Sequence, residues 1–330
     1  MSDTLLQIQD LHLEFKTGRG ILKALSGITL DVNRGEIFGV VGETGCGKTV
    51  TGLSVLQLLP QSANIPQGKI LFEGRNLPDT SEREMSKIRG GEIAMIFQDP
   101  TTSLNPVFAI GKQLTRIVRE HFNMNRKEAR AHIAKIFESV GLPDVERIMN
   151  SYPHQLSGGM QQRVMIALAL ACQPKLLIAD EPTTALDVTI QAQILTLLKE
   201  LRDEFGISII LITHNLGVVA NTCDRLAVLY AGRVAESGLT KDIFNNPQHP
   251  YTRGLIKAIP RPTLRGERMD AIPGTVPLNP GAVVGCPFAP RCELAFLRCE
   301  EEQPPLMKIG DSHYSACFAS VASEKEVAND

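Results

Sequence analysis

Hydrophobic and polar residues alternate with a period of two in the first part of the chain. The alternating apolar positions are Leu6, Ile8, Leu11, Leu13 and Phe15, followed after a glycine-containing turn by Ile28, Leu30 and Val32. Alternation of this kind is typical of half-buried strands, so it predicts an N-terminal pair of antiparallel strands. Short apolar runs bounded by turn residues predict two further strands, at 68–72 and 93–97.

The pattern changes to a helical period between about residues 104 and 141, where apolar residues recur among charged ones. This change predicts a helical insertion. The chain then alternates between element types, with a strand at 176–179, a helix at 188–205, a strand at 207–212 and a last strand pair at 226–230 and 234–236. Alternating strands and helices predict an α/β fold with a mostly parallel sheet covered by helices.

Composition shifts beyond Gly238, because 9 of the 20 prolines lie between Pro260 and Pro305. We therefore expect a domain boundary near residue 240. The first domain (1–240) would contain an antiparallel β subdomain and a helical subdomain at about 104–165. The second region (241–330) would be a small appendage rich in cysteine and proline.

Bulk properties exclude several classes of protein. A chain of 330 residues with 43% hydrophobic content can bury a large core. The net charge of −2 supplies no general basic face, so we expect no nucleic acid partner. The longest apolar stretches are shorter than the roughly 20 residues that span a bilayer, and no export signal is visible at the N-terminus. Seven cysteines, an odd number, argue against a secreted disulfide framework, and a cytosolic location is expected.

The chain is organised around a phosphate-binding pattern. It follows the apolar run 37–41 and consists of Gly42, Glu43, Thr44, Gly45, Cys46, Gly47, Lys48 and Thr49. The glycines let the backbone turn its N–H groups toward a polyphosphate, Lys48 would reach the terminal phosphates, and the Thr49 hydroxyl would bind Mg²⁺. The alternative is a glycine-rich turn with a solvated lysine.

Two adjacent carboxylates, Asp180 and Glu181, end the apolar strand that begins near Leu176. A nucleoside triphosphatase with such a loop needs an acid at this place to hold Mg²⁺, and Asp180 would take that role. Glu181 would polarise the attacking water as a general base. The alternative is a strand that ends in two solvated acids.

A second anion site is predicted where Ser157, Gly158 and Gly159 open an Ala- and Leu-rich helix that runs to about Cys172. Two phosphate sites in one chain indicate a nucleotide held between two copies. The alternative is a serine N-cap followed by glycines that only pack closely. Two further residues have open interpretations: His214 follows a strand and is either a ligand-contacting or a buried structural histidine, while Phe15 either stacks on a base or belongs to the core.

Together these motifs resemble those of the ATP-binding cassette (ABC) ATPases, and they occur in the family order over residues 1 to about 240. The set comprises the phosphate loop, Gln98, the LSGGM sequence at 156–160, Asp180–Glu181, the sequence 184–187 that ends in Asp187, and His214. The resemblance implies binding and hydrolysis of two ATP·Mg²⁺ between the phosphate loop of one subunit and the Ser157 helix of another. It further implies that Gln98 links the γ-phosphate and Mg²⁺ to the helical subdomain, that His214 contacts the γ-phosphate, and that Phe15 stacks on adenine.

The sequences at 97–100, 103–106, 152–155 and 249–252 resemble the oligopeptide/dipeptide importers within that family. This resemblance implies a paralogous ATPase subunit as heterodimer partner, two membrane permeases and an external peptide-binding protein. It places the chain at the cytoplasmic face of the bacterial inner membrane. Cargo other than peptides, such as a nickel chelate, glutathione or an antimicrobial peptide, remains an alternative, as do a cassette ATPase acting on nucleic acid and a stand-alone kinase.

Four cysteines lie in the proline-rich C-terminal segment, namely Cys286, Cys292, Cys299 and Cys317. Four thiols in a cytosolic chain indicate a metal site before disulfides. Their spacing does not match the short pairs of zinc ribbons, whereas iron–sulfur ligation tolerates varied spacing. The family resemblance implies a [4Fe–4S] cluster, with Zn²⁺ or free thiols as the alternatives.

Overall fold

The computed structural model describes residues 3–18, 20–99, 103–184, 186–259, 272–277 and 279–320. The chain forms two compact units, which are described separately. The helical unit comprises residues 33–37 and 79–212, and the phosphate-loop unit comprises residues 2–32, 38–78 and those from 213 onward.

The phosphate-loop unit begins with the predicted N-terminal strands. Its first elements are β1 (Thr4–Thr17), β2 (Gly20–Asn33), β3 (Ile37–Val41), α1 (Lys48–Val55), β4 (Ala63–Phe72) and β5 (Arg75–Asn76). One sheet has the order β2-β1-β4-β5, in which β1 and β4 are antiparallel. The alternation therefore predicts β1 and β2 correctly. The strand predicted at 68–72 is the second half of a longer strand, β4.

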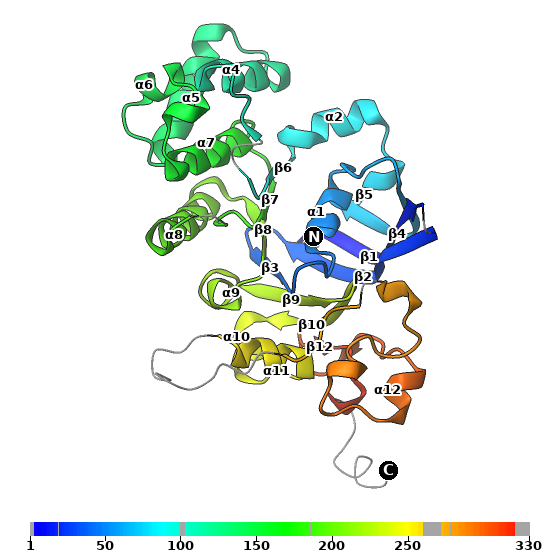
Figure 1. The fold of residues 1–330 in the computed structure, drawn as a ribbon. Helices are drawn as coiled ribbons and strands as arrows, with labels where there is room; N and C mark the ends of the chain where they lie inside the picture. The colour runs from blue at the N-terminus through cyan, green and yellow to red at the C-terminus, as the bar shows by residue number, and fades with distance from the viewer. Residues whose placement is uncertain are drawn as a thin grey trace. The chain divides into compact units, whose positions relative to one another are not determined.

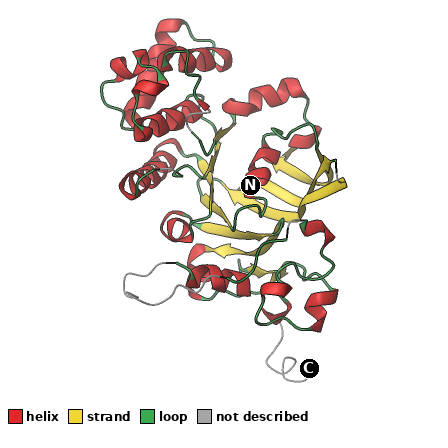
Figure 2. Cartoon of the chain, in the orientation of Figure 1, coloured by secondary structure: helices red, strands yellow, loops and turns green. Residues whose placement is uncertain are grey.

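The remaining elements of this unit are α9 (Leu216–Thr222), β9 (Arg225–Tyr230), β10 (Arg233–Leu239), α10 (Thr240–Asn245), α11 (Pro250–Lys257), α12 (Leu297–Glu301), β11 (Met307–Lys308) and β12 (Tyr314–Ser315). Within the unit, β3 pairs in parallel with β9, and β9, β10, β12 and β11 continue as antiparallel neighbours. In Figure 2 the segment after α11 consists mainly of loops and short helices.

The C-terminal segment joins this sheet through a buried carboxylate. Glu236 of β10 is fully buried and lies opposite Ser315 of β12. Its side chain accepts the N–H groups of Gln248 at 2.7 Å and His249 at 2.9 Å, and it lies 2.7 Å from Nε2 of His313. A buried carboxylate is tolerated where such hydrogen bonds compensate its lost hydration. The domain boundary near residue 240 stays a prediction, but β10 and β12 share one sheet across it.

The helical unit contains α2 (Glu82–Gly91), β6 (Ile93–Ile96), α4 (Ile110–His121), α5 (Arg126–Ser139), α6 (Val145–Asn150), α7 (Gly158–Leu170), β7 (Leu176–Asp180), α8 (Val188–Phe205) and β8 (Ser208–Thr213). The strands β6, β7 and β8 are parallel neighbours in that order. Helices α4, α5, α6 and α7 lie together (Figure 1). The predicted helical insertion is confirmed by α4 and α5.

Local sequence explains where these helices begin and end. Asn125 caps α5, because its side chain accepts the N–H of Glu128 while the Glu128 carboxylate accepts the N–H of Asn125. Helix α8 occupies the predicted range 188–205 and ends at Gly206, whose φ of 65° favours glycine. Among the described residues we find no helix with both the length and the apolar character needed to cross a bilayer.

Candidate nucleotide-binding site

The backbone of the phosphate loop connects the buried strand β3 to helix α1, as the sequence predicts. Gly42, Gly45 and Gly47 have φ angles of 151°, 83° and 105°, a region in which other residues are strained. At Gly42 there is also no space for a side chain, since a Cβ atom would lie 2.2 Å from the carbonyl oxygen of Leu229. The glycine pattern is thus a requirement of the loop's conformation.

Lys48 is buried inside this loop, with a relative exposure of 6%. Its Nζ donates hydrogen bonds to the carbonyl oxygens of Gly42 at 2.8 Å and Glu43 at 3.0 Å. The interpretation as a solvated lysine is therefore wrong. The loop holds a desolvated positive charge at the start of a helix, which is the electrostatic requirement for a phosphate site.

Cys46 lies beside this charge, with its Sγ atom 3.9 Å from Nζ of Lys48. The side chain is fully buried. Burial raises the pKa of the Cys46 thiol, and the nearby Lys48 ammonium only partly opposes that effect. The thiol is therefore protonated at neutral pH and a poor nucleophile, because the thiolate is the reactive form.

Phe15 and His214 also belong to the phosphate-loop unit. Phe15 lies in β1 opposite Ala63 and is half-buried rather than part of the core. His214 is exposed, directly before Asn215, the N-cap of α9. The interpretation of His214 as a buried structural residue is wrong. Adenine stacking by Phe15 and the γ-phosphate contact of His214 stay predictions, as do the metal roles of Thr49 and Gln98.

The predicted catalytic carboxylate, Glu181, lies in the helical unit just beyond β7. Its Oε2 atom accepts hydrogen bonds from Nε2 of Gln98 at 3.2 Å and from Oγ1 of Thr184 at 2.8 Å. Its φ angle is +46°, which is uncommon for a residue other than glycine and occurs at functional sites. The structure thus brings together two residues, Gln98 and Glu181, that are 83 positions apart in the sequence.

Asp180 ends strand β7 and is buried, with a relative exposure of 3%. The alternative of two solvated acids is therefore wrong for Asp180. The two carboxylates have different environments, because Asp180 is the last residue of β7 whereas Glu181 lies beyond the strand, is partly exposed and has a positive φ. The role of Asp180 in holding Mg²⁺ stays a prediction.

Ser157 is the N-cap of α7, since its Oγ accepts the N–H of Met160 at 3.4 Å. The helix covers 158–170, close to the predicted range. A Cβ at Gly159 would approach the Ile190 side chain to 3.3 Å, whereas one at Gly158 would be in ordinary contact with Leu186. Close packing therefore contributes to the choice of glycine at 159, and the anion-binding role of this helix end stays a prediction.

Asp187 is likewise an N-cap, because its Oδ1 accepts the N–H of Ile190 at 2.9 Å and so begins α8. Its neighbour Ala185, within the motif 184–187, lies outside the described residues, as does Pro100 of the motif 97–100. The capping role explains the aspartate locally. Its contribution to a nucleotide site stays a prediction.

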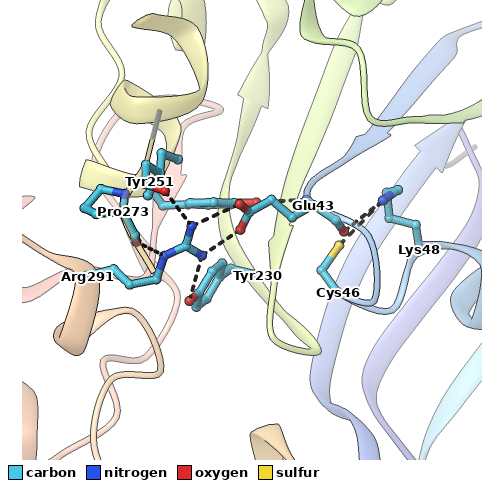
Figure 3. A network of polar contacts seen from close by, with 8 residues as sticks. Glu43, Cys46, Lys48, Tyr230, Tyr251, Pro273 and Arg291 are labelled. Atoms are coloured by element: carbon cyan, nitrogen blue, oxygen red, sulfur yellow. Dashed lines mark hydrogen bonds and ion pairs between the residues drawn. The ribbon is translucent and has the colours of Figure 1, made fainter. Parts of the chain in front are cut away.

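The sequence analysis missed two residues that contact the phosphate loop, Tyr251 and Arg291. The Tyr251 hydroxyl accepts the N–H of Glu43 at 2.9 Å, and the Arg291 guanidinium holds the Glu43 carboxylate with two hydrogen bonds of 2.7 and 3.0 Å (Figure 3). Tyr251 lies in the motif 249–252, which marked only a family resemblance. No periodicity or spacing indicates an ion pair between residues 248 positions apart.

All four C-terminal cysteines line one pocket, together with His249 and Phe288. Burial, with a smaller contribution from neighbouring Cys299 and Cys317, raises the pKa of the Cys286 thiol to about 11. No group of three His, Cys, Asp or Glu side chains in the described part of the chain is arranged to hold one metal ion. The structure therefore gathers the predicted thiols without forming a compact single-ion site.

Comparison with known proteins agrees with this site. A family model described as ABC transporter matches residues 25–184, and one described as the C-terminal region of oligopeptide/dipeptide transporters matches 235–299. The dipeptide transport ATP-binding protein DppD of Bacillus subtilis is 49% identical over 317 residues, covering 96% of this chain and 95% of that protein. The oligopeptide transport ATP-binding protein OppD of Escherichia coli is 46% identical over 320 residues, covering 97% and 94%.

Solved structures show the same fold. The dimeric bacterial ABC transporter cassette MJ0796 matches with a TM-score of 0.64 and 28% identity, covering 72% of this chain and 99% of that one. A second structure of that cassette is dimeric, in a post-hydrolysis state bound to ADP and phosphate.

Proposed function

Because the chain belongs to the ATP-binding subunits of peptide ABC transporters, we propose that its phosphate loop and its Ser157 helix form the two halves of composite ATP sites in a dimer. As an ABC ATPase of this family the chain hydrolyses ATP to power peptide import. The loop of one subunit would hold the phosphates, and the helix N-terminus of the other subunit would cover the γ-phosphate.

The observation that carries this proposal is the buried ammonium of Lys48 within a loop of three left-handed glycines. Such a loop concentrates N–H donors and one positive charge around a polyphosphate. The capped N-terminus of α7, a helix of 13 residues, supplies a second concentration of positive potential. The dimeric form of the related cassette MJ0796 supports the pairing of two such chains.

Each predicted site residue has one role in this scheme. The Mg²⁺ that bridges the phosphates would be held by Thr49, Asp180 and Gln98. Glu181 would accept the proton of the attacking water. His214 would contact the γ-phosphate. The hydrogen bonds from Gln98 and Thr184 support Glu181 in this role, because they fix the orientation of its carboxylate. Phe15 would stack on adenine.

We further propose that the chain works at the cytoplasmic face of the bacterial inner membrane, in a complex with a paralogous ATPase subunit and two permeases. An external binding protein would deliver the peptide. The similarity to the dipeptide transport protein DppD and the oligopeptide transport protein OppD supports dipeptides or oligopeptides as cargo. The genes adjacent to that of this chain, above all the one for the binding protein, would distinguish peptides from nickel chelates, glutathione or antimicrobial peptides.

The composite site can be tested by size-exclusion chromatography with light scattering. In the Glu181→Gln background, ATP and Mg²⁺ should convert the chain into a dimer, alone or mixed with its paralogue. Adding Ser157→Arg should prevent this dimer, because a long cation then occupies the place of the γ-phosphate, while ATP binding to the single chain persists. Ser86→Arg, at an exposed serine of α2, is the control. Unimpaired dimerisation of the Ser157→Arg variant would contradict the composite site.

For the C-terminal cysteines we propose a [4Fe–4S] cluster that fastens this segment. In a cubane cluster each thiolate binds a different iron, so the four sulfurs lie farther apart than around a single ion. The gathering of all four cysteines around one pocket supports a cofactor that they share. When bound, the cluster would supply a covalent link among the parts of the C-terminal segment that carry the four cysteines.

An anaerobic preparation should therefore be brown and contain iron and sulfide. Cys299→Ser should reduce the iron content and lower the melting temperature, because one of four ligands is lost. Cys172→Ser is the matched control, since Cys172 is also a buried cysteine but does not line the pocket. A colourless protein with one zinc per chain would contradict the cluster.

A further inference from the structure

We propose that Arg291 is a positioning residue for ATP binding, which holds the phosphate loop in its binding conformation from the C-terminal segment. The inference deepens the proposed function, since it takes the loop around Lys48 as the ATP site. It gives the C-terminal segment a direct role in nucleotide affinity. Figure 3 shows the contacts from Arg291 through Glu43 to Lys48.

The Arg291 side chain uses every hydrogen-bond donor it has. Its Nε donates to the carbonyl oxygen of Pro273 at 2.7 Å, and its two Nη atoms bind the two oxygens of Glu43. Further contacts reach the Tyr230 hydroxyl and the Ile272 carbonyl oxygen, both at 3.3 Å. Because a guanidinium has five N–H groups in one plane, hydrogen bonds to five acceptor atoms on four residues fix both its place and its orientation.

Burial makes this ion pair stronger than a surface pair. The Arg291 side chain is only 5% exposed, while that of Glu43 is 31% exposed. The guanidinium also lies 5.7 Å from the ring centroid of Tyr230 and 5.9 Å from that of Phe288. A bidentate, largely desolvated pair between a planar cation and a carboxylate is among the stronger polar interactions in proteins. Loss of Arg291 would leave a half-buried carboxylate without its partner, and loss of the Glu43 charge would leave a buried cation without its partner.

Tyr251 binds the backbone of Glu43. It is fully buried and its hydroxyl oxygen accepts the Glu43 N–H, so this N–H is directed toward α11. Burial raises the pKa of Tyr251, so the hydroxyl stays neutral at physiological pH. The ring also packs against those of Tyr230 and Phe288. Glu43 is thus fixed by both its side chain and its backbone.

The fixed position of Glu43 affects Lys48 through the Glu43 carbonyl group. The carbonyl oxygen of Glu43 accepts a hydrogen bond from Lys48 Nζ at 3.0 Å, and that of Gly42 accepts another at 2.8 Å. The glycines on either side permit many backbone conformations, so the loop needs an external contact to select one. Arg291 and Tyr251 supply that contact at Glu43. Preorganisation of this kind lowers the entropic cost of binding the phosphates.

The test compares Arg291→Ala, Arg291→Lys and Glu43→Gln in the full-length chain, with a fluorescent ATP analogue for affinity and phosphate release for turnover. Arg291→Ala should raise the dissociation constant and the KM for ATP about tenfold, the effect of losing one charge-assisted contact. The kcat at saturating ATP should change less than about twofold, because Arg291 does not contact the reacting atoms. The Arg291→Lys variant should have a KM for ATP between those of the wild-type and Arg291→Ala proteins. Lysine keeps the positive charge but lacks the planar pair of donors that binds both carboxylate oxygens.

Arg225→Ala is the matched control. Arg225 lies in the same unit and binds the Asp31 carboxylate with hydrogen bonds of 2.9 and 3.3 Å, in an ion pair whose acid lies outside the phosphate loop. It should lower the melting temperature without changing the KM. The double variant that combines Glu43→Gln with Arg291→Ala should bind ATP no more weakly than the weaker of the two single variants. This is expected when the two residues are partners in one interaction.

The outcomes separate this inference from the function on which it rests. An Arg291→Ala protein with unchanged ATP affinity, or one that behaves as Arg225→Ala does, overturns the inference while leaving the ATPase intact. A wild-type chain that does not bind ATP overturns the proposed site itself. If Arg291→Ala does not fold, the Glu43→Gln variant decides, because it preserves the side-chain shape and should show the same raised KM.

Discussion

Replacing Glu181 with Gln should reduce ATP turnover by about 100- to 10,000-fold, the usual contribution of a general base. The substitution is nearly isosteric. Its amide oxygen can still accept the hydrogen bonds that Gln98 and Thr184 donate to Glu181 Oε2 at 3.2 and 2.8 Å. The amide cannot take a proton from water, so the chemical step is lost while the local structure persists.

The measurement is phosphate release under single-turnover conditions, with nucleotide binding followed separately. ATP should remain bound in the dimer for much longer than in the wild-type chain. Glu120→Gln is the control, because Glu120 is an exposed carboxylate of α4 that pairs with Arg116. Hydrolysis at the wild-type rate by the Glu181→Gln variant would remove this residue from the mechanism and leave the strained backbone at +46° without a catalytic explanation.

Replacing Lys48 with Ala should weaken ATP binding by at least about 100-fold, since two or more charge-assisted hydrogen bonds to phosphate are lost. It should also lower the melting temperature without nucleotide. The carbonyl oxygens of Gly42 and Glu43 lose the donor that holds them at 2.8 and 3.0 Å. The two effects have different causes, because the first requires ATP and the second does not.

Equilibrium binding of a fluorescent ATP analogue and thermal unfolding would measure these effects. Lys69→Ala is the control, at an exposed lysine of β4 in the same unit. It should change neither quantity appreciably. If the Lys48→Ala chain retained wild-type affinity, the loop could not be the ATP site, and the inference about Arg291 would lose its premise as well.

Much of the local structure is evident from the residues. Alternation predicts β1 and β2, helical periodicity predicts α4 and α5, and the predicted range of about 188–205 agrees with α8. The phosphate loop is equally local, since its glycines, Lys48 and Thr49 occupy eight consecutive positions. A binding site whose residues all lie in one short segment can be predicted from the sequence alone.

Other predictions failed or fell short where the outcome depends on distant parts of the chain. The strand at 68–72 is longer than its apolar run, because β4 pairs with β1 from Ala63 onward. A buried structural role was one interpretation of His214, whereas this residue is exposed beyond the end of β8. The presence of four thiols in one segment suggested a metal site, but the sequence does not determine how their sulfur atoms are arranged.

The sequence by itself determined the ATPase motifs, the strand-loop-helix unit around Lys48 and the family to which the chain belongs. Only the tertiary structure decided that Gln98 reaches Glu181, that Glu236 fastens the C-terminal segment to β10, and that Tyr251 and Arg291 hold Glu43. The physical reason is that periodicity and spacing record interactions along the chain. Buried hydrogen bonds and ion pairs between remote residues form only when packing excludes water around both partners.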